Sequence, residues 1–294
     1  MSRPARKYMG GGLHVSASSL RVLQECPRQF FYQYLQGRPR ESVSSRMIIG
    51  TAIHAALEAF YRALMENREE PGLDELVEVA AASLRQAVAG PFPVAFDDGE
   101  DLEAMEAECN RVLTAFLDAP YRPHKVLGVE EPFGLALRDE DTGELLYDEL
   151  VVGFFDLVAE DEDGTVAIVD HKVSSRLAVP KSTEQDVQLG LYAWAGDQIA
   201  SGQVRLRHHV LVRGKKAVRA EIVDIPRSPS DSRETHEAIC SGLEMIQVAV
   251  EHPRPDALLG RRRSWRCGGC GYRAACSTKV TTVGSHVRRV AKSS

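Results

Sequence analysis

The feature that most restricts the fold of this 294-residue chain is a pair of apolar runs joined by a short acidic turn. Residues 151–159 and 165–172 are rich in Val, Ile, Leu and Phe, and the sequence EDEDG separates them. Such runs predict two antiparallel strands in a largely buried sheet. Each strand nevertheless carries charge in its interior, with Asp156 in the first and Asp170 and Lys172 in the second.

The register of this hairpin predicts where the charges lie. If the turn is centred near Asp163, Asp156 lies directly opposite Asp170, and their side chains share one face of the sheet. Lys172 joins them because strand side chains alternate with a period of two, so His171 points to the other face. Two facing carboxylates repel, and a hard divalent cation between them relieves the repulsion. The alternative is a solvated sheet edge where the acids are staggered and Lys172 only neutralises them.

The rest of the chain predicts an α/β protein whose helices come mainly before the hairpin. Apolar periodicity and turn residues delimit each element. Pro27 should break the first helix beside Cys26. Expected helices cover residues 16–35, 50–69, 73–88, 101–117, 184–200 and 231–250, and expected strands cover 125–137, 144–159, 165–172, 204–212 and 217–225.

Composition restricts the compartment. The chain has no uninterrupted apolar stretch of about 18 residues and begins without the apolar run of a secretory signal, so we expect a cytoplasmic protein with no membrane partner. Thiols stay reduced there, which makes the six cysteines metal ligands or packing residues rather than disulfides. Cys109 and Cys240 fall in helical segments, and we assign them to packing.

Three cysteines form a compact trio, Cys267-X2-Cys270-X5-Cys276, in a polar, glycine-rich context. Soft thiolates at this spacing indicate a metal centre that is one ligand short of four. Spacing alone leaves zinc and an iron-sulfur cluster both open.

Charge is unevenly distributed along the chain. Residues 1–40 and 261–294 together hold 16 Lys and Arg but one acid, Glu25, whereas the chain as a whole has a net charge of -6. Taken singly, basic ends are solvated arms. Joined by a metal centre, they would form a patch suited to a polyphosphate substrate.

The hairpin motifs resemble those of a known group. Gly153-Phe154-Phe155-Asp156 followed by Val169-Asp170-His171-Lys172 is similar to the core motif of PD-(D/E)XK nucleases. The resemblance implies a restriction-endonuclease-like core, a mixed central sheet flanked by helices. It also implies that Asp156, Asp170 and the backbone carbonyl of His171 bind a catalytic Mg²⁺ or Mn²⁺, while Lys172 positions the attacking water.

Two further segments resemble the RecB-like branch of this superfamily. Residues 50–58, GTAIHAALE, match its histidine helix, which implies that His54 is a metal ligand. Glu58, one turn later on the same face, would support that ligand. Gln188 and Tyr192 fit the branch's Gln-X-X-X-Tyr helix and would act at the catalytic site.

The segment Glu25-Cys26-Pro27-Arg28-Gln29-Phe30 resembles the first cysteine motif of iron-sulfur RecB-like nucleases, which include AddB and the CRISPR-adaptation nucleases. This implies a [4Fe-4S] cluster that joins the N- and C-terminal segments. Its ligands would be Cys26, Cys267, Cys270 and Cys276. We therefore expect one nuclease domain over 1–294, with a cysteine segment at 13–45, a helical region at 46–122, the nuclease core at 123–255, a cysteine-rich segment at 256–280 and a basic tail at 281–294.

The function expected from this resemblance is metal-dependent hydrolysis of DNA. Single-stranded DNA or DNA ends would be the substrate of an exonuclease in repair, recombination or CRISPR adaptation, with a helicase or CRISPR-adaptation protein as a possible partner. Tyr192 or Trp265 would stack on bases, and the expected phosphate contacts are Arg28, Arg261, Arg262, Arg263 and Arg266. Two alternatives stay open: a catalytically silent iron-sulfur DNA-binding subunit, and a zinc ribbon appended to an unrelated α/β protein.

Overall fold

The N-terminal segment folds as two helices with a break at the predicted proline. The computed structural model describes residues 14–97, 99–138, 142–177, 186–200, 202–214, 217–227 and 230–277, so the predicted basic tail at 281–294 lies outside them. Strand β1 (His14–Val15) precedes α1 (Ala17–Glu25), which Ser16 caps. Cys26 is extended, and Pro27 begins α2 (Pro27–Phe30), which continues as the π-helical turn η2 (Phe31–Leu35). The predicted break is confirmed.

Three helices then form a layer on one side of the molecule. They are α3 (Ser45–Met65), α4 (Leu73–Val88) and α5 (Leu102–Asp118). The start of α3 was predicted at residue 50, but the helix begins five residues earlier because the Ser44 hydroxyl accepts the backbone N–H of Met47 and caps it. Short strands β2 (Val43–Ser44) and β3 (Val94–Ala95) pair in parallel beside this layer.

The described residues form a six-stranded mixed sheet. Its long strands are β4 (Lys125–Arg138), β5 (Leu145–Glu160), β6 (Val166–Ser174), β7 (Arg205–Arg213) and β8 (Val218–Ile225). The order is β1-β5-β6-β7-β8, with β4 pairing β5. The predicted antiparallel pairs β4–β5, β5–β6 and β7–β8 are confirmed. Helix α6 (Val187–Ala200) connects β6 to β7, which pair in parallel.

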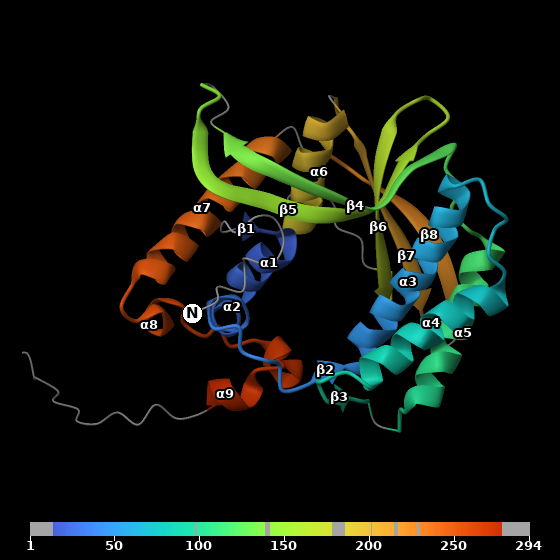
Figure 1. The fold of residues 1–294 in the computed structure, drawn as a ribbon, viewed down its shortest axis with the longest axis horizontal. Helices are drawn as coiled ribbons and strands as arrows, with labels where there is room; N and C mark the ends of the chain where they lie inside the picture. Colours follow the sequence, from blue (N-terminus) through green and yellow to red (C-terminus); the bar gives the residue numbers. More distant parts are fainter. Residues whose placement is uncertain are drawn as a thin grey trace, which may run out of the picture.

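Helices cover both faces of this sheet (Figure 1). One core packs α1, α6 and the long helix α7 (Asp231–Glu251) against the sheet, and the other packs α3, α4 and α5 against its opposite face. Neighbouring residues of β6 show the division, since Ile168 belongs to the first core and Val169 to the second. The mixed central sheet flanked by helices agrees with the expected fold class.

The chain ends in short elements beside α2. These are α8 (Pro255–Leu258), a 3-10 turn η4 (Trp265–Gly269) and α9 (Arg273–Ser277). Cys109 is buried in the α3–α5 core and Cys240 packs against the other core, as predicted. Among the described helices, none combines the length and the apolar character required to cross a membrane.

Candidate active site and cysteine cavity

The hairpin of β5 and β6 has the register predicted from its turn. Leu157 pairs with Val169 and Val158 with Ile168, and Asp156 and Asp170 come next in this register. The ladder stops before them. There the backbone N–H of His171 donates to Asp156 Oδ2 at 2.8 Å, so the carboxylate takes the place of a strand hydrogen bond.

Strand alternation is interrupted at this point. Phe155 and Leu157 are two residues apart, yet Phe155 packs in the α6–α7 core and Leu157 in the α3–α5 core. Residues two apart in a regular strand share one face. Asp156 therefore lies where β5 turns over and separates from β6.

Asp170 sits in a polar network below the N-terminal end of α6. Its side chain is 2% exposed. Lys172 Nζ lies 2.9 Å from Asp170 Oδ1 and 2.8 Å from Oδ2. Gln188 Nε2 donates to Asp170 Oδ1 at 3.1 Å and to the Tyr192 hydroxyl at 3.0 Å. The structure thus places the predicted residue Gln188 in contact with the Asp170 and Lys172 pair, and Tyr192 joins the network through Gln188.

Tyr192 also links this network to β5. Its hydroxyl donates to the backbone carbonyl of Phe154 at 2.8 Å, two residues before Asp156. Gln188 Oε1 accepts a hydrogen bond from Lys172 Nζ at 3.1 Å. One helix therefore holds the backbone next to one aspartate and the side chain of the other.

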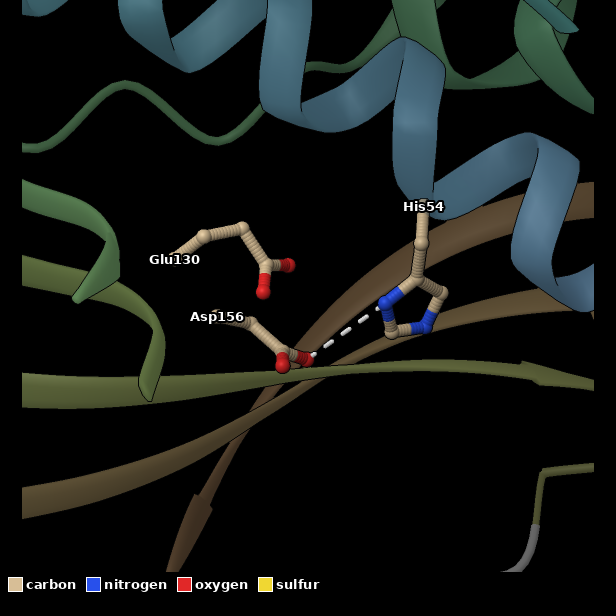
Figure 2. A group of neighbouring side chains, drawn as sticks. All are labelled: His54, Glu130 and Asp156. Carbon is tan, nitrogen blue, oxygen red and sulfur yellow. Dashed lines mark ion pairs between the residues drawn. The ribbon is translucent and has the colours of Figure 1, made fainter. Parts of the chain in front are cut away.

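On the other side of Asp156, three side chains from three elements converge (Figure 2). They are His54 from α3, Glu130 from β4 and Asp156 from β5, and each offers a ligand atom within 4.8 Å of the others. His54 Nδ1 lies 3.7 Å from Asp156 Oδ2. An imidazole and two carboxylates form a donor set that a divalent metal accepts.

Glu130 is absent from the residues predicted above. It has a positive φ of 50° in the middle of β4, a conformation that is uncommon for a residue with a side chain. The sequence shows only two adjacent glutamates, Glu130 and Glu131, within an apolar strand. Their position there was a signal that one of them faces a functional site.

Burial raises the proton affinity of the acids. It raises the pKa of Glu130 to about 7, with a further contribution from the Asp156 carboxylate. Burial also raises the pKa of Asp156 and of Asp170, and the Lys172 ammonium partly offsets both shifts. Buried carboxyl groups that repel one another in this way are stabilised by a bound cation.

Burial lowers the pKa of His54, which favours the neutral imidazole that binds metals. Glu58 lies one turn away, but its carboxylate pairs with Arg62 at 2.8 Å. Glu58 also contributes to the raised pKa of Glu130. Glu58 therefore influences Glu130 electrostatically. Its support of His54 stays a prediction.

His171 occupies the opposite face, as its alternation predicted. Its ring stacks on Tyr61, with centroids 5.3 Å apart, and its Nδ1 lies 3.2 Å from His209 Nδ1. This packing holds the backbone of the Asp170-His171-Lys172 triplet from the α3 side of the sheet.

The four predicted cysteine ligands line one cavity of about 310 Å³. Cys26 comes from the junction of α1 and α2, Cys267 from η4 and Cys276 from α9, and Cys270 lies between η4 and α9. Burial raises the pKa of Cys270, with contributions from the other three thiols. The chain therefore brings together cysteines that are about 240 residues apart.

Hydrogen bonds between protein groups hold the two segments in place. Glu41 accepts the backbone N–H groups of Ala274 and Ala275 at 2.9 and 3.0 Å. The backbone N–H of Arg28 donates to the Gly260 carbonyl at 3.1 Å, and its guanidinium donates to the Asp256 carbonyl at 2.5 Å.

Four of the predicted DNA-contacting arginines line the same cavity, namely Arg28, Arg261, Arg262 and Arg263. Arg261 donates to the carbonyl of Cys276 within the C-terminal segment, and Arg262 donates to that of Gln24, so Arg262 also joins the two segments. Arg266 pairs with Glu25 at 2.9 Å and lies over the Trp265 ring. Trp265 is 86% exposed, which leaves its ring face accessible.

Comparison with known proteins agrees with the fold described above and identifies the family. The chain aligns with a candidate exonuclease from Eubacterium rectale at 11% identity and with a TM-score of 0.54. The alignment covers 92% of this chain and 91% of that one, and it supports the fold alone. A second structure, SSO0001, aligns at 11% identity over 90% of this chain and 96% of that one, with a TM-score of 0.35 that carries no weight. No protein with a curated description matches. The family model for the PD-(D/E)XK nuclease superfamily matches residues 14–277, and the chain therefore belongs to that superfamily.

Proposed function

We propose that this nuclease hydrolyses phosphodiester bonds of DNA with Mg²⁺ or Mn²⁺ held by Asp156, Asp170, His54 and the backbone carbonyl of His171, with Glu130 as an additional ligand. The observation that supports it best is the meeting of His54, Glu130 and Asp156 within 4.8 Å of one another where β5 separates from β6. The backbone N–H of His171 donates to Asp156, which sets the neighbouring Asp170 and its partner Lys172 beside this group. Such a site, with its repelling acids and neutral imidazole, fits a hard divalent cation.

The residues divide the chemical work between them. A bound divalent ion would activate water and stabilise the charge that develops on the phosphate. Lys172 would hold the nucleophile with its ammonium, and its side chain is 33% exposed, so substrate can reach it. Gln188 orients Lys172 through the 3.1 Å hydrogen bond. Tyr192 keeps the β5 backbone in place beside Asp156.

We propose that the substrate is single-stranded DNA or a DNA end, cut exonucleolytically in repair, recombination or CRISPR adaptation alongside a helicase or a CRISPR-adaptation protein. Trp265, exposed and flanked by arginines, fits stacking on an unpaired base. Arginine has five N–H donors, so one hydrogen bond to a backbone carbonyl leaves the others for phosphates. The proposed phosphate contacts are Arg28, Arg261, Arg262, Arg263 and Arg266.

We further propose that Cys26, Cys267, Cys270 and Cys276 hold a [4Fe-4S] cluster in a single nuclease domain. A tetrahedral zinc site with Zn–S bonds of about 2.3 Å places its sulfurs roughly 3.8 Å apart. Among the described residues, no three of these thiols lie within 4.8 Å of one another. A shared cavity of about 310 Å³ that is lined by all four cysteines fits the larger cluster.

The catalytic proposal is tested by cleavage of end-labelled single- and double-stranded DNA in Mn²⁺. Asp170→Ala and Lys172→Ala should each lower the rate by about 10²–10³-fold, because each removes a group that stabilises the transition state. Asp163→Ala, at the exposed turn of the same hairpin, is the control and should cut like the parent. Undiminished cleavage by both active-site variants would refute the proposal, and DNA binding by a parent that does not cleave would instead favour a silent subunit.

A further inference from the structure

His208 lies on β7 directly beside Asp170. The two strands pair in parallel, with Asp170 opposite His208 in the register, so both side chains project from the same face. His208 Nε2 is 3.3 Å from Asp170 Oδ2. No feature of the sequence singled out this histidine, because its neighbour in space is separated from it by a whole helix.

Both side chains are buried, His208 at 3% exposure and Asp170 at 2%. Within the described part of the chain, neither ring nitrogen of His208 makes an aligned hydrogen bond, and Asp170 Oδ2 makes none either. Buried polar atoms without partners destabilise a fold. An apolar side chain would fill the space without this penalty, so the imidazole is explained only by its contact with Asp170.

The other donors approach Asp170 from elsewhere. Gln188 donates to Oδ1, and Lys172 lies between the two oxygens. A carboxylate offers about four lone-pair sites. Lys172 and Gln188 occupy about two of them and His208 faces a third, which leaves one for a cation.

We propose that His208 is a positioning residue that donates its Nε2–H to Asp170 Oδ2 and fixes the carboxylate in the orientation that binds the metal. This inference rests on the proposed function, since it assumes that Asp170 is a ligand. Carboxylates that bind metals are commonly oriented by hydrogen bonds from a second group, and loss of that group lowers metal affinity by about 10–100-fold.

The test is Mn²⁺ binding to the full-length protein without DNA, measured by calorimetry, together with the KM and kcat for DNA cleavage. His208→Leu should weaken Mn²⁺ binding about 10–100-fold. The KM for DNA should stay unchanged, and kcat should recover when Mn²⁺ is raised.

Rescue separates positioning from packing. His208→Gln carries an amide N–H where the imidazole has Nε2, and it should restore Mn²⁺ affinity to within a few-fold of the parent. His208→Asn, whose amide lies at the Nδ1 position, should not. This comparison remains decisive if His208→Leu fails to fold. Leu206→Ala, a buried change two residues earlier on the same face of β7, is the control for packing loss and should lower stability while Mn²⁺ affinity stays unchanged.

The outcomes distinguish this inference from the proposed function. Parent-like Mn²⁺ affinity in His208→Leu, equal affinities in the Gln and Asn variants, or an equal loss in Leu206→Ala would overturn the role of His208. In each of these cases Asp170→Ala would still weaken Mn²⁺ binding and lower the cleavage rate by about 10²–10³-fold. Retention of both by Asp170→Ala would instead remove the proposed function.

Discussion

At the scale of single residues, the candidate site depends on a backbone conformation that is unfavourable unless the folded structure enforces it. Glu130 is the clearest instance, since its φ of 50° turns its carboxylate toward His54 and Asp156. Backbone strain of this kind persists only where the surrounding structure enforces it, and it concentrates at functional sites. We therefore place Glu130 with the proposed metal ligands, although it lies outside both hairpin motifs.

Replacing this carboxylate tests its role. Glu130→Gln keeps the shape and removes the charge, and we expect Mn²⁺ affinity at pH 8 to fall about tenfold or more. The pKa of Glu130 is about 7, so in the parent protons compete with the metal below that pH. Mn²⁺ affinity should accordingly rise between about pH 6 and 8 in the parent and rise less in the variant. Superimposable titrations of the two proteins would contradict the assignment.

The same pKa shift has a consequence for stability without metal. A carboxyl group whose pKa is raised on folding binds more protons in the native state than in the unfolded one. Its contribution is therefore present below its ordinary pKa of 4.5 and is lost as the pH rises toward 7. Thermal midpoints of the metal-free parent should fall over this range, and those of Glu130→Gln should fall less.

At the scale of elements, the long β4–β5 hairpin positions the site through close packing. Phe133 stacks on Phe155 with ring centroids 4.6 Å apart, next to Asp156. This arrangement requires a glycine opposite, because a Cβ at Gly153 would lie 2.4 Å from the Phe133 ring. The glycine of the first hairpin motif therefore permits the aromatic packing that supports β5.

Gly153→Ala should overpack this contact and lower the free energy of unfolding by about 1–3 kcal/mol. Urea denaturation provides the measurement, and the displaced β5 should also reduce cleavage. Gly202→Ala is the matched control, because a Cβ there meets nothing within 4 Å and should leave stability unchanged or slightly higher. Equal stability of the two variants would show that Phe133 moves aside at little cost.

At the scale of the whole molecule, the two ends of the chain form one structural unit. Glu41, Arg28 and Arg262 each bond groups of the opposite segment, and these bonds hold the cysteine cavity without any metal. A cluster bound there would also tie together parts of the chain that rarely meet when unfolded, which stabilises the native state.

Cys26→Ser tests this link from the N-terminal side. The variant should lose most of the iron of the proposed cluster, together with the absorbance at about 400 nm that thiolate-bound clusters show. Its thermal midpoint should fall. Iron analysis and melting curves supply the two measurements. Cys240→Ser, a half-buried thiol outside the cavity, should retain the iron. A zinc-loaded, colourless parent would contradict the iron-sulfur proposal.

Much of this protein was determined by the sequence alone. Apolar periodicity, proline and turn residues specify the helices and the antiparallel hairpins, and the turn near Asp163 sets the register of β5 against β6. These features are local, because each depends on residues that are close in the chain. The resemblance of short motifs predicted Asp156, Asp170, Lys172 and His54 as site residues, because such motifs are also local in the chain.

Only the tertiary structure decided how distant elements meet at the site. The positive φ of Glu130, the reversal of β5 at Asp156 and the parallel pairing that sets His208 beside Asp170 depend on packing of the whole sheet between its helices. The start of α3 depends on a cap that the apolar pattern does not show. Local patterns cannot predict such contacts, because each contact joins residues that are far apart in the sequence and meet only in the folded chain.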